Sequence, residues 1–346
     1  MSWLALTLAL LLGAWKPDGV GAGAGTLLAR WVDAMARQRF LPVTRLGSQA
    51  GAIVVVLTIA LPTVVVAAVH GLLNQASSLL GLLFQMAVLI GCLGAQRVRQ
   101  RFMAVRDALD REDTDAARRM LADWMGRAPE SLAGQDFVRT LASHALVQAH
   151  RQVLGVMFAF VALAALGLGP AGAVLYRLAC LVPQRSASGA SEAATRPEAP
   201  SPTAVVVPEG AEDGAAEASG EARSSAQLVD FARVVRDAVD HGPSRLTAVG
   251  FAVVGHFDQA VTAWRRDAGL WDDAGAGVVL AAAGGATGLD LSSSTAPRSD
   301  ADTGVDAEAS AGLSTASVAP LVALVSRSVL LWMLVLALLT LANVIG

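Results

Sequence analysis

Long apolar stretches constrain the fold of this chain more than any other feature. Such runs lie near residues 50–73, 78–95, 154–182 and 317–346. A helix needs roughly 20 predominantly apolar residues to cross the hydrocarbon core of a bilayer. Lipid cannot satisfy the polar groups of the backbone, so a spanning segment must be a helix or part of a closed barrel. The stretches therefore predict an all-α, polytopic integral membrane helical bundle.

Composition agrees with this prediction, because 54% of the residues are hydrophobic and only 16% are charged. Residues 1–15 add a shorter apolar run that ends at Trp15 and Lys16. This run lacks the basic n-region and the small-residue cleavage site of a signal peptide. We interpret it as a first membrane helix or a shallow anchor, which gives four or five spans in all.

The arginines predict the topology. Residues 97–151 begin with a cluster of arginines and show apolar residues at helical spacing, so we expect a helical loop. Within this loop Asp113 can cap a helix that ends at Gly126. Residues 16–49 contain a short amphipathic helix, lying at the membrane surface or packed in the cytoplasm. The positive-inside rule places both basic segments in the cytoplasm of a multi-pass membrane protein.

The C-terminal half alternates between two kinds of sequence. Residues 183–225 and 290–316 are poor in large apolar side chains, so we expect disordered segments. Residues 226–289 read as amphipathic or interfacial helices, with a stop at Gly242–Pro243. The loop 183–318 would then lie outside. Its side would flip if 154–182 were re-entrant or if 246–264 entered the membrane.

Net charge, cysteine spacing and motifs argue against several classes of function. A net charge of −3 argues against a nucleic-acid partner. The two cysteines, Cys92 and Cys180, form no CxxC pair, so neither a zinc site nor a disulfide framework is expected. The glycine-rich run 274–288 lacks the Gly-Lys-Ser/Thr ending of a phosphate loop, and close helix packing explains it better. We predict no metal site and no cofactor, with the lipid bilayer as the main partner.

Two pairs of polar residues border the third apolar stretch and are candidate ligand contacts. His150 and Arg151 precede it, and an arginine there could bind an anion through its guanidinium fork. Tyr176 and Arg177 stand near its end. The alternative for both pairs is anchoring at the membrane interface. The ligand would be an unknown small molecule or a membrane partner protein.

A second set of candidates lies on a segment that is neither a good span nor a good soluble helix. These candidates are Arg245, Asp258, Trp264 and Arg265. A charge within or beside the membrane suggests function, because placing it there is costly. We expect ligand contacts here and assign no catalytic residue.

Four segments together resemble a known group, the CobD/CbiB and AmpE superfamily of bacterial inner-membrane proteins. They are HRQVLGVMFAF with GPAGAVLYRL (150–178), PSRLTAVGFAVVGHFDQAVTAWR (243–265), AGAGVVLAAAGGATGL (274–289) and SRSVLLWML (326–334). The likeness extends over most of the chain, apart from the two low-complexity stretches.

The resemblance implies two different functions. CbiB-type proteins are cobalamin biosynthesis proteins, adenosylcobinamide-phosphate synthases that join cobyric acid to an aminopropanol phosphate with ATP and magnesium. Their acidic signature should fall at about residues 143–158, where this chain has no carboxylate. AmpE-type proteins also lack those acids and are implied to act as sensors linked to the cell-wall or β-lactam response. The sequence therefore favours a non-enzymatic, AmpE-like regulatory protein, with the ATP-dependent amide ligase as the alternative.

Overall fold

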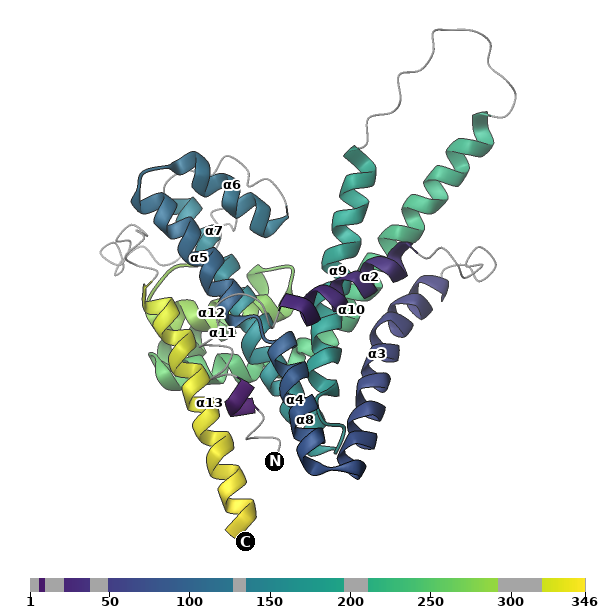
Figure 1. Cartoon of the computed structure of the whole chain (residues 1–346). Helices are drawn as coiled ribbons and strands as arrows, with labels where there is room; N and C mark the ends of the chain where they lie inside the picture. The colour runs from purple at the N-terminus through teal and green to yellow at the C-terminus, as the bar shows by residue number, and fades with distance from the viewer. Residues whose placement is uncertain are drawn as a thin grey trace.

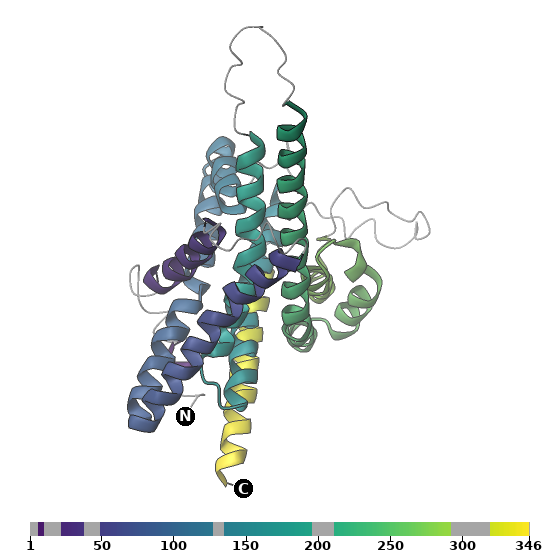
Figure 2. The same ribbon diagram turned by 90° about the vertical axis from the view of Figure 1, so that its right-hand side faces the viewer.

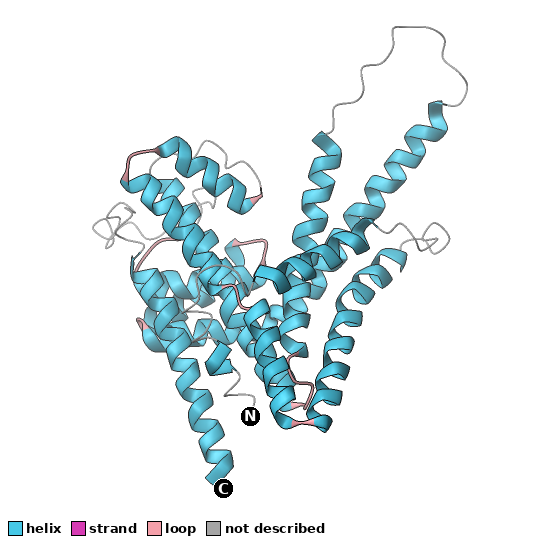
Figure 3. Ribbon diagram, viewed as in Figure 1, coloured by secondary structure: helices cyan, strands magenta, loops and turns pink. Residues whose placement is uncertain are grey.

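The structure, a computed structural model, describes residues 6–9, 22–37, 49–126, 135–195, 211–291 and 319–345. Over these residues the chain is a bundle of helices without strands (Figures 1 and 3). Four of the described helices are long and apolar enough to cross a bilayer, over 52–76, 78–110, 136–165 and 319–342. The prediction of an all-α polytopic membrane bundle is thus confirmed.

The N-terminal part contains a helical hairpin. Helices α3 (Gln49–Ala76) and α4 (Ser78–Cys92) meet at Ser77, and Pro62 lies inside α3 without ending it. Helix α2 (Ala22–Arg37) packs across α3, α4 and α9, and the indole Nε1 of Trp31 donates to the carbonyl of Thr58 at 3.1 Å. Of the predicted first span, 1–15, only residues 6–9 are described, and they are helical.

The basic segment after this hairpin contains the helix that the sequence predicts between Asp113 and Gly126. Helix α5 (Ala95–Asp110) leads into α6 (Thr114–Met125). The Asp113 carboxylate accepts from the backbone N–H of Ala116, and Gly126 ends α6 in the left-handed conformation at φ 69°. Figure 1 places this α5–α6 hairpin at the end of the bundle opposite the α3–α4 turn.

The third apolar stretch, 154–182, for which the sequence leaves a kinked or a re-entrant element open, forms two helices with a chain reversal between them. Helix α7 (Gln135–Ala149) continues through a π-helical turn, η2 (His150–Leu154), into α8 (Gly155–Ala165), and helix α9 (Ala171–Thr195) starts anew. Between α8 and α9, Gly167 and Gly169 adopt positive φ values of 80° and 57°. Glycine tolerates this conformation, which reverses the chain. The end of the expected soluble loop, α7, therefore belongs to the span-length helix 136–165.

The predicted stop at Gly242–Pro243 is wrong, because α10 (Ala211–Val254) runs through it. A proline inside a helix removes one backbone hydrogen bond. The next turns of α10 are held by fully buried side chains, Ser244, Thr247 and Phe251. The expected disordered linker 183–225 is helical at its two ends, in α9 and α10, while residues 196–210 lie outside the described part.

Helix α10 is the central element of the bundle. It packs against α3, α8, α9, α11, α12 and α13. Helices α9 and α10 run side by side in both views, and α11 (Phe257–Asp267), η3 (Ala268–Leu270) and α12 (Ala274–Thr287) lie to one side of α10 (Figures 1 and 2). The small residues of α12 are mostly buried, which allows close packing between helices.

The last helix, α13 (Ala319–Ile345), corresponds to the predicted C-terminal span. One side packs on α10 and α12, while Leu330, Leu334 and Leu338 are exposed. Exposed leucines at this spacing form the surface that a membrane helix presents to lipid. The second predicted disordered stretch, 290–316, falls almost wholly outside the described residues.

Candidate functional site

Buried polar side chains gather where η2, α9, α10 and the start of α12 meet. We call this group the buried polar cluster; it comprises His150, Arg151, Tyr176, Arg236, Asp240, Thr247 and Asp273. Five of its members expose 8% or less of their surface. Burying polar and charged groups is costly unless they are paired, so each member of the cluster is expected to have a partner.

His150 is the centre of the cluster. Its Nε2 lies 2.9 Å from Oδ1 of Asp240, and its Nδ1 lies 2.9 Å from the hydroxyl of Thr247. The Tyr176 hydroxyl donates to the same Oδ1 at 2.6 Å. An ionised carboxylate only accepts, so Nε2 carries a proton. A histidine between a hydroxyl and a carboxylate has the order of a catalytic triad. Thr247 is fully buried, however, so its hydroxyl is not exposed to a substrate from solution.

Arg151 forms a second unit beside the first. Its guanidinium pairs with Asp273, and Arg236 approaches the same carboxylate at 2.9 Å. The other oxygen of Asp273 accepts from the backbone N–H of Ala276 at 2.9 Å, which caps helix α12. One carboxylate thus joins η2, α10 and α12.

Two glycines let these elements approach one another. A Cβ at Gly155 would overlap the phenol ring of Tyr176, and a Cβ at Gly275 would overlap the carboxylate of Asp240. The five residues of η2 are all buried. Short π-helical turns inside α-helices occur frequently at functional sites. This turn places His150 and Arg151 in the middle of the bundle.

We expect Gly155→Ala to destabilise the protein by about 1–3 kcal/mol, because the added methyl must displace a fully buried ring. The thermal unfolding of the detergent-solubilised protein measures this. Gly71→Ala is the matched control, since Gly71 lies in helix α3 with no atom near its missing Cβ. Equal melting temperatures for the two variants would contradict the close approach at Tyr176.

The environment of the two carboxylates favours their ionised forms. Burial alone would raise the pKa of Asp240, but His150, the hydrogen bond from Tyr176 and the charge of Arg151 outweigh it and lower that pKa below its ordinary 3.8. Burial likewise opposes ionisation of Asp273, but Arg151, Arg236 and the N–H of Ala276 lower its pKa. Both aspartates are therefore anions at neutral pH.

These lowered pKa values predict a dependence of stability on acid. A carboxyl group with a lower pKa in the folded state contributes stability that is complete above its unfolded value of 3.8. This contribution is lost as the pH falls through the folded-state pKa. We expect the melting temperature to fall steeply below about pH 4. Asp240→Asn and Asp273→Asn should weaken that fall, and an unchanged acid profile in both would contradict the prediction.

The structure brings together three of the eight predicted site residues, His150, Arg151 and Tyr176. Arg177 is buried on α9, and its Nε atom has no hydrogen-bond partner among the described residues. The second predicted set does not converge. Arg245 is exposed and donates to the carbonyl of His241, while Asp258 and Arg265 are exposed on α11. Trp264 is half-buried against the small core of Ala248, Val278 and Ala282.

Sequence reasoning missed the acidic half of the cluster, Asp240 and Asp273, together with Arg236 and Thr247. One signal was present. Asp240, Ser244 and Thr247 recur at a helical spacing of four and three residues, which makes a polar stripe on one face of α10. Such a stripe indicates a buried polar contact with another element.

The magnesium and ATP that the family resemblance implies do not fit this cluster. Magnesium prefers carboxylate oxygens and water as ligands. Among the described residues, no group of three or more His, Cys, Asp or Glu side chains could hold a metal ion. Asp240 and Asp273 are each engaged by cationic or hydroxyl partners of this chain.

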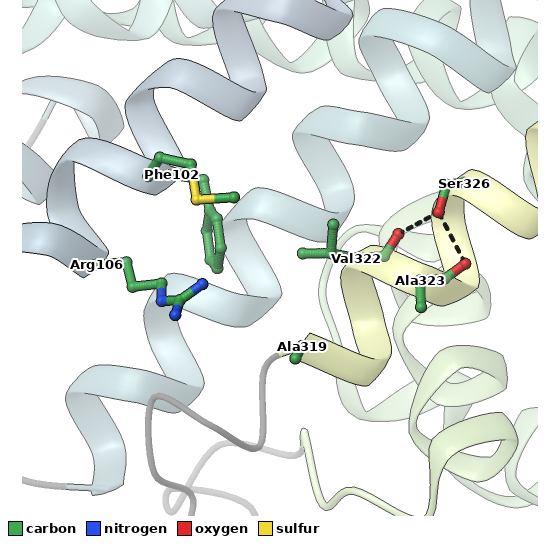
Figure 4. Close-up of a pocket in the computed structure, with 7 residues that line it drawn as sticks. Phe102, Arg106, Ala319, Val322, Ala323 and Ser326 are labelled. Carbon is green, nitrogen blue, oxygen red and sulfur yellow. Dashed lines mark hydrogen bonds between the residues drawn. The ribbon is translucent and has the colours of Figure 1, made fainter. Parts of the chain in front are cut away.

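A groove of about 260 Å³ lies elsewhere in the described structure, between α5 and α13 (Figure 4). Phe102 and Val322 line it, and Arg106 lies at its edge. None of the predicted site residues borders it. Its lining is mostly apolar, and Arg106 pairs with Asp110 at 3.4 Å. None of the residues that line the groove belongs to the buried polar cluster.

Comparison with known proteins adds independent information. The family model of the CobD/Cbib proteins matches residues 3–181, just over half of the chain. Cobalamin biosynthesis protein CobD of Stutzerimonas stutzeri (strain A1501) is 27% identical over 212 residues, which cover 61% of this chain and 58% of that protein. The match thus spans less than two thirds of the relative's length. No solved structure matches the chain.

Proposed function

The chain belongs to the CobD/CbiB family, and we propose on that basis that it acts in cobalamin biosynthesis, at the amide-forming step that the family resemblance implies. The observation that carries this proposal is the family match over residues 3–181, together with the relative named as a cobalamin biosynthesis protein. The location would be the bacterial inner membrane, with multiple passes through it.

The buried polar cluster supports a role for both parts of the chain in one unit. His150, Arg151 and Tyr176 lie inside the family-matched region, and their partners Asp240 and Asp273 lie beyond it. The cluster therefore joins the matched region to α10 and α12. Because these charges neutralise one another, we assign the cluster the task of fixing the helices that surround a ligand.

The proposal is tested by complementation. A bacterial strain that lacks its own CobD/CbiB protein should grow on cobinamide but fail on cobyric acid. Expression of this chain should restore growth on cobyric acid. A chain present in the membrane at normal level that does not restore growth would overturn the proposal.

One observation favours a different function, the AmpE-like regulatory protein. Residues 143–158 contain no carboxylate, and the two buried aspartates are paired within the chain. A regulator needs the fold and not the catalytic acids. If this function applies, the complemented strain should fail on cobyric acid, and deletion of the native gene should alter the induction of β-lactamase by a β-lactam.

A further inference from the structure

The groove between α5 and α13 has a largely apolar wall on each helix (Figure 4). Phe102 and Met103 form the wall on α5. The wall on α13 consists of short side chains at helical spacing, which are Ala319, Val322, Ala323 and Ser326. The Ser326 hydroxyl donates to the carbonyls of Val322 and Ala323 at 2.9 and 3.0 Å, so its proton is used within α13. Both walls therefore present mainly apolar surface to a molecule that enters the groove.

The groove lies at the ends of two candidate membrane spans. Its two walls belong to 78–110 and 319–342, which are both long and apolar enough to cross a bilayer. Its residues lie near the end of the first segment and at the start of the second. Further along α13, Leu330 and Leu334 are 68% and 58% exposed, as on a helix that faces lipid. This position places the groove where acyl chains meet lipid headgroups.

Arg106 is the charged residue among the described residues that line the groove. Figure 4 shows its guanidinium extending from α5 toward α13. Its Nε atom has no hydrogen-bond partner among the described residues, although it lies 3.4 Å from Oδ2 of Asp110. The two side chains are 43% and 44% exposed, and an ion pair so exposed contributes little to stability. The guanidinium can therefore offer paired N–H donors to a phosphate at the edge of the groove.

The charge of helix α5 favours an anionic molecule at this place. Its sequence, Ala95–Asp110, contains four arginines and two aspartates, so the helix carries a net positive charge. Arg99 and Arg101 are exposed on it. Basic residues beside a membrane span attract anionic lipid headgroups. An anionic phospholipid therefore matches both the charge of α5 and the apolar walls of the groove.

We propose that the groove binds one anionic phospholipid, with part of an acyl chain between α5 and α13 and the phosphate at Arg106. The volume of about 260 Å³ lies below the roughly 300–1,000 Å³ of pockets that enclose a drug-sized ligand. The groove therefore holds a segment of one chain, and the rest of the lipid stays in the bilayer. This site is separate from the buried polar cluster and does not depend on the proposed function.

The test uses the full chain purified in a neutral detergent. Phosphatidylglycerol, phosphatidylcholine and glycerol 3-phosphate are titrated separately, and the melting temperature is followed. We expect phosphatidylglycerol to raise the melting temperature at a lower concentration than phosphatidylcholine. Glycerol 3-phosphate should have no effect, because it has no acyl chain to bury. Equal effects of the two lipids, or an effect of glycerol 3-phosphate equal to that of phosphatidylglycerol, would overturn the proposal.

One pair of variants tests the headgroup contact. Arg106→Gln should weaken the binding of phosphatidylglycerol by about tenfold, the change expected when a charge-assisted contact is lost. It should also remove the preference over phosphatidylcholine. Arg101→Gln is the matched control, because Arg101 is exposed on the same helix and does not line the groove. Equal lipid binding by these two variants would refute the role of Arg106.

A second pair tests the groove itself. Val322 is 42% exposed, so Val322→Trp adds a large ring to the groove without repacking the core, and it should reduce lipid binding. Leu330→Trp is the control on the same helix, outside the groove, and should bind like the natural chain. The mass of each variant in detergent is measured by light scattering. A dimer of the natural chain that Val322→Trp converts into a monomer would assign the groove to a second copy and overturn the proposal.

Discussion

Asp273→Ala is expected to lower the free energy of unfolding by about 3–5 kcal/mol, the cost of removing one partner from a buried ion pair. Arg151 exposes only 10% of its side chain and would be left without its carboxylate. Arg236 would lose one of its two carboxylates and would face Arg151. Helix α12 would also lose its N-cap acceptor, which typically costs about 0.5–2 kcal/mol.

The neighbouring residue offers a close control. Asp272 is exposed, and Asp272→Ala removes the same charge one position away. Both variants should be compared by thermal and denaturant unfolding in detergent, with membrane levels measured in cells. We expect the free energy of unfolding of Asp272→Ala to lie within about 0.5 kcal/mol of that of the natural chain. A similar stability for both variants would show that Asp273 does not hold the three elements together.

Asp240→Ala is expected to be nearly as damaging. It removes the acceptor for both His150 and Tyr176, which are 1% and 0% exposed. A buried donor left without an acceptor costs about 1–3 kcal/mol, so two such donors imply a loss of about 2–6 kcal/mol. The loss should appear as a lower melting temperature and as less protein in the membrane.

Two further variants separate this loss from a general effect of charge removal. Asp230→Ala lies on the same helix, with 72% of the side chain exposed, and should be nearly neutral. Tyr176→Phe removes one of the two donors, so in the double variant with Asp240→Ala the two losses should add to less than their sum. Simple additivity would mean that Tyr176 and Asp240 are not coupled.

The helical runs could be predicted because their signals are local. The α3–α4 hairpin follows from two apolar runs separated by a short polar turn, and α6 follows from Asp113 and Gly126 at its ends. In the sequence, the chain reversal at 166–170 is marked by glycines and a proline, which indicate that a helix ends or kinks there. A break alone does not distinguish a kink from a reversal, because neighbouring helices decide between them. Packing likewise kept α10 intact at Pro243.

The site was predictable only in part. His150, Arg151 and Tyr176 stood out as polar residues beside an apolar stretch, and the structure brings them together. Arg245, Asp258 and Arg265 stood out for the same reason, but they are exposed. The same local pattern therefore gave both outcomes, since burial depends on what packs against a helix face. No local pattern indicates that Asp240 and Asp273 neutralise the residues around position 150.

By itself the sequence determined that the protein is a helical membrane protein and which segments are apolar enough to form its spans. The length and apolarity of its runs require helices in a membrane, because lipid offers the backbone no hydrogen bonds. Only the tertiary structure decided which charges pair. His150 meets Asp240 across 90 residues of chain, and Arg151 meets Asp273 across 122. Such partners are selected by the packing of whole helices, and the same packing left the Nε atom of the buried Arg177 without a hydrogen-bond partner among the described residues.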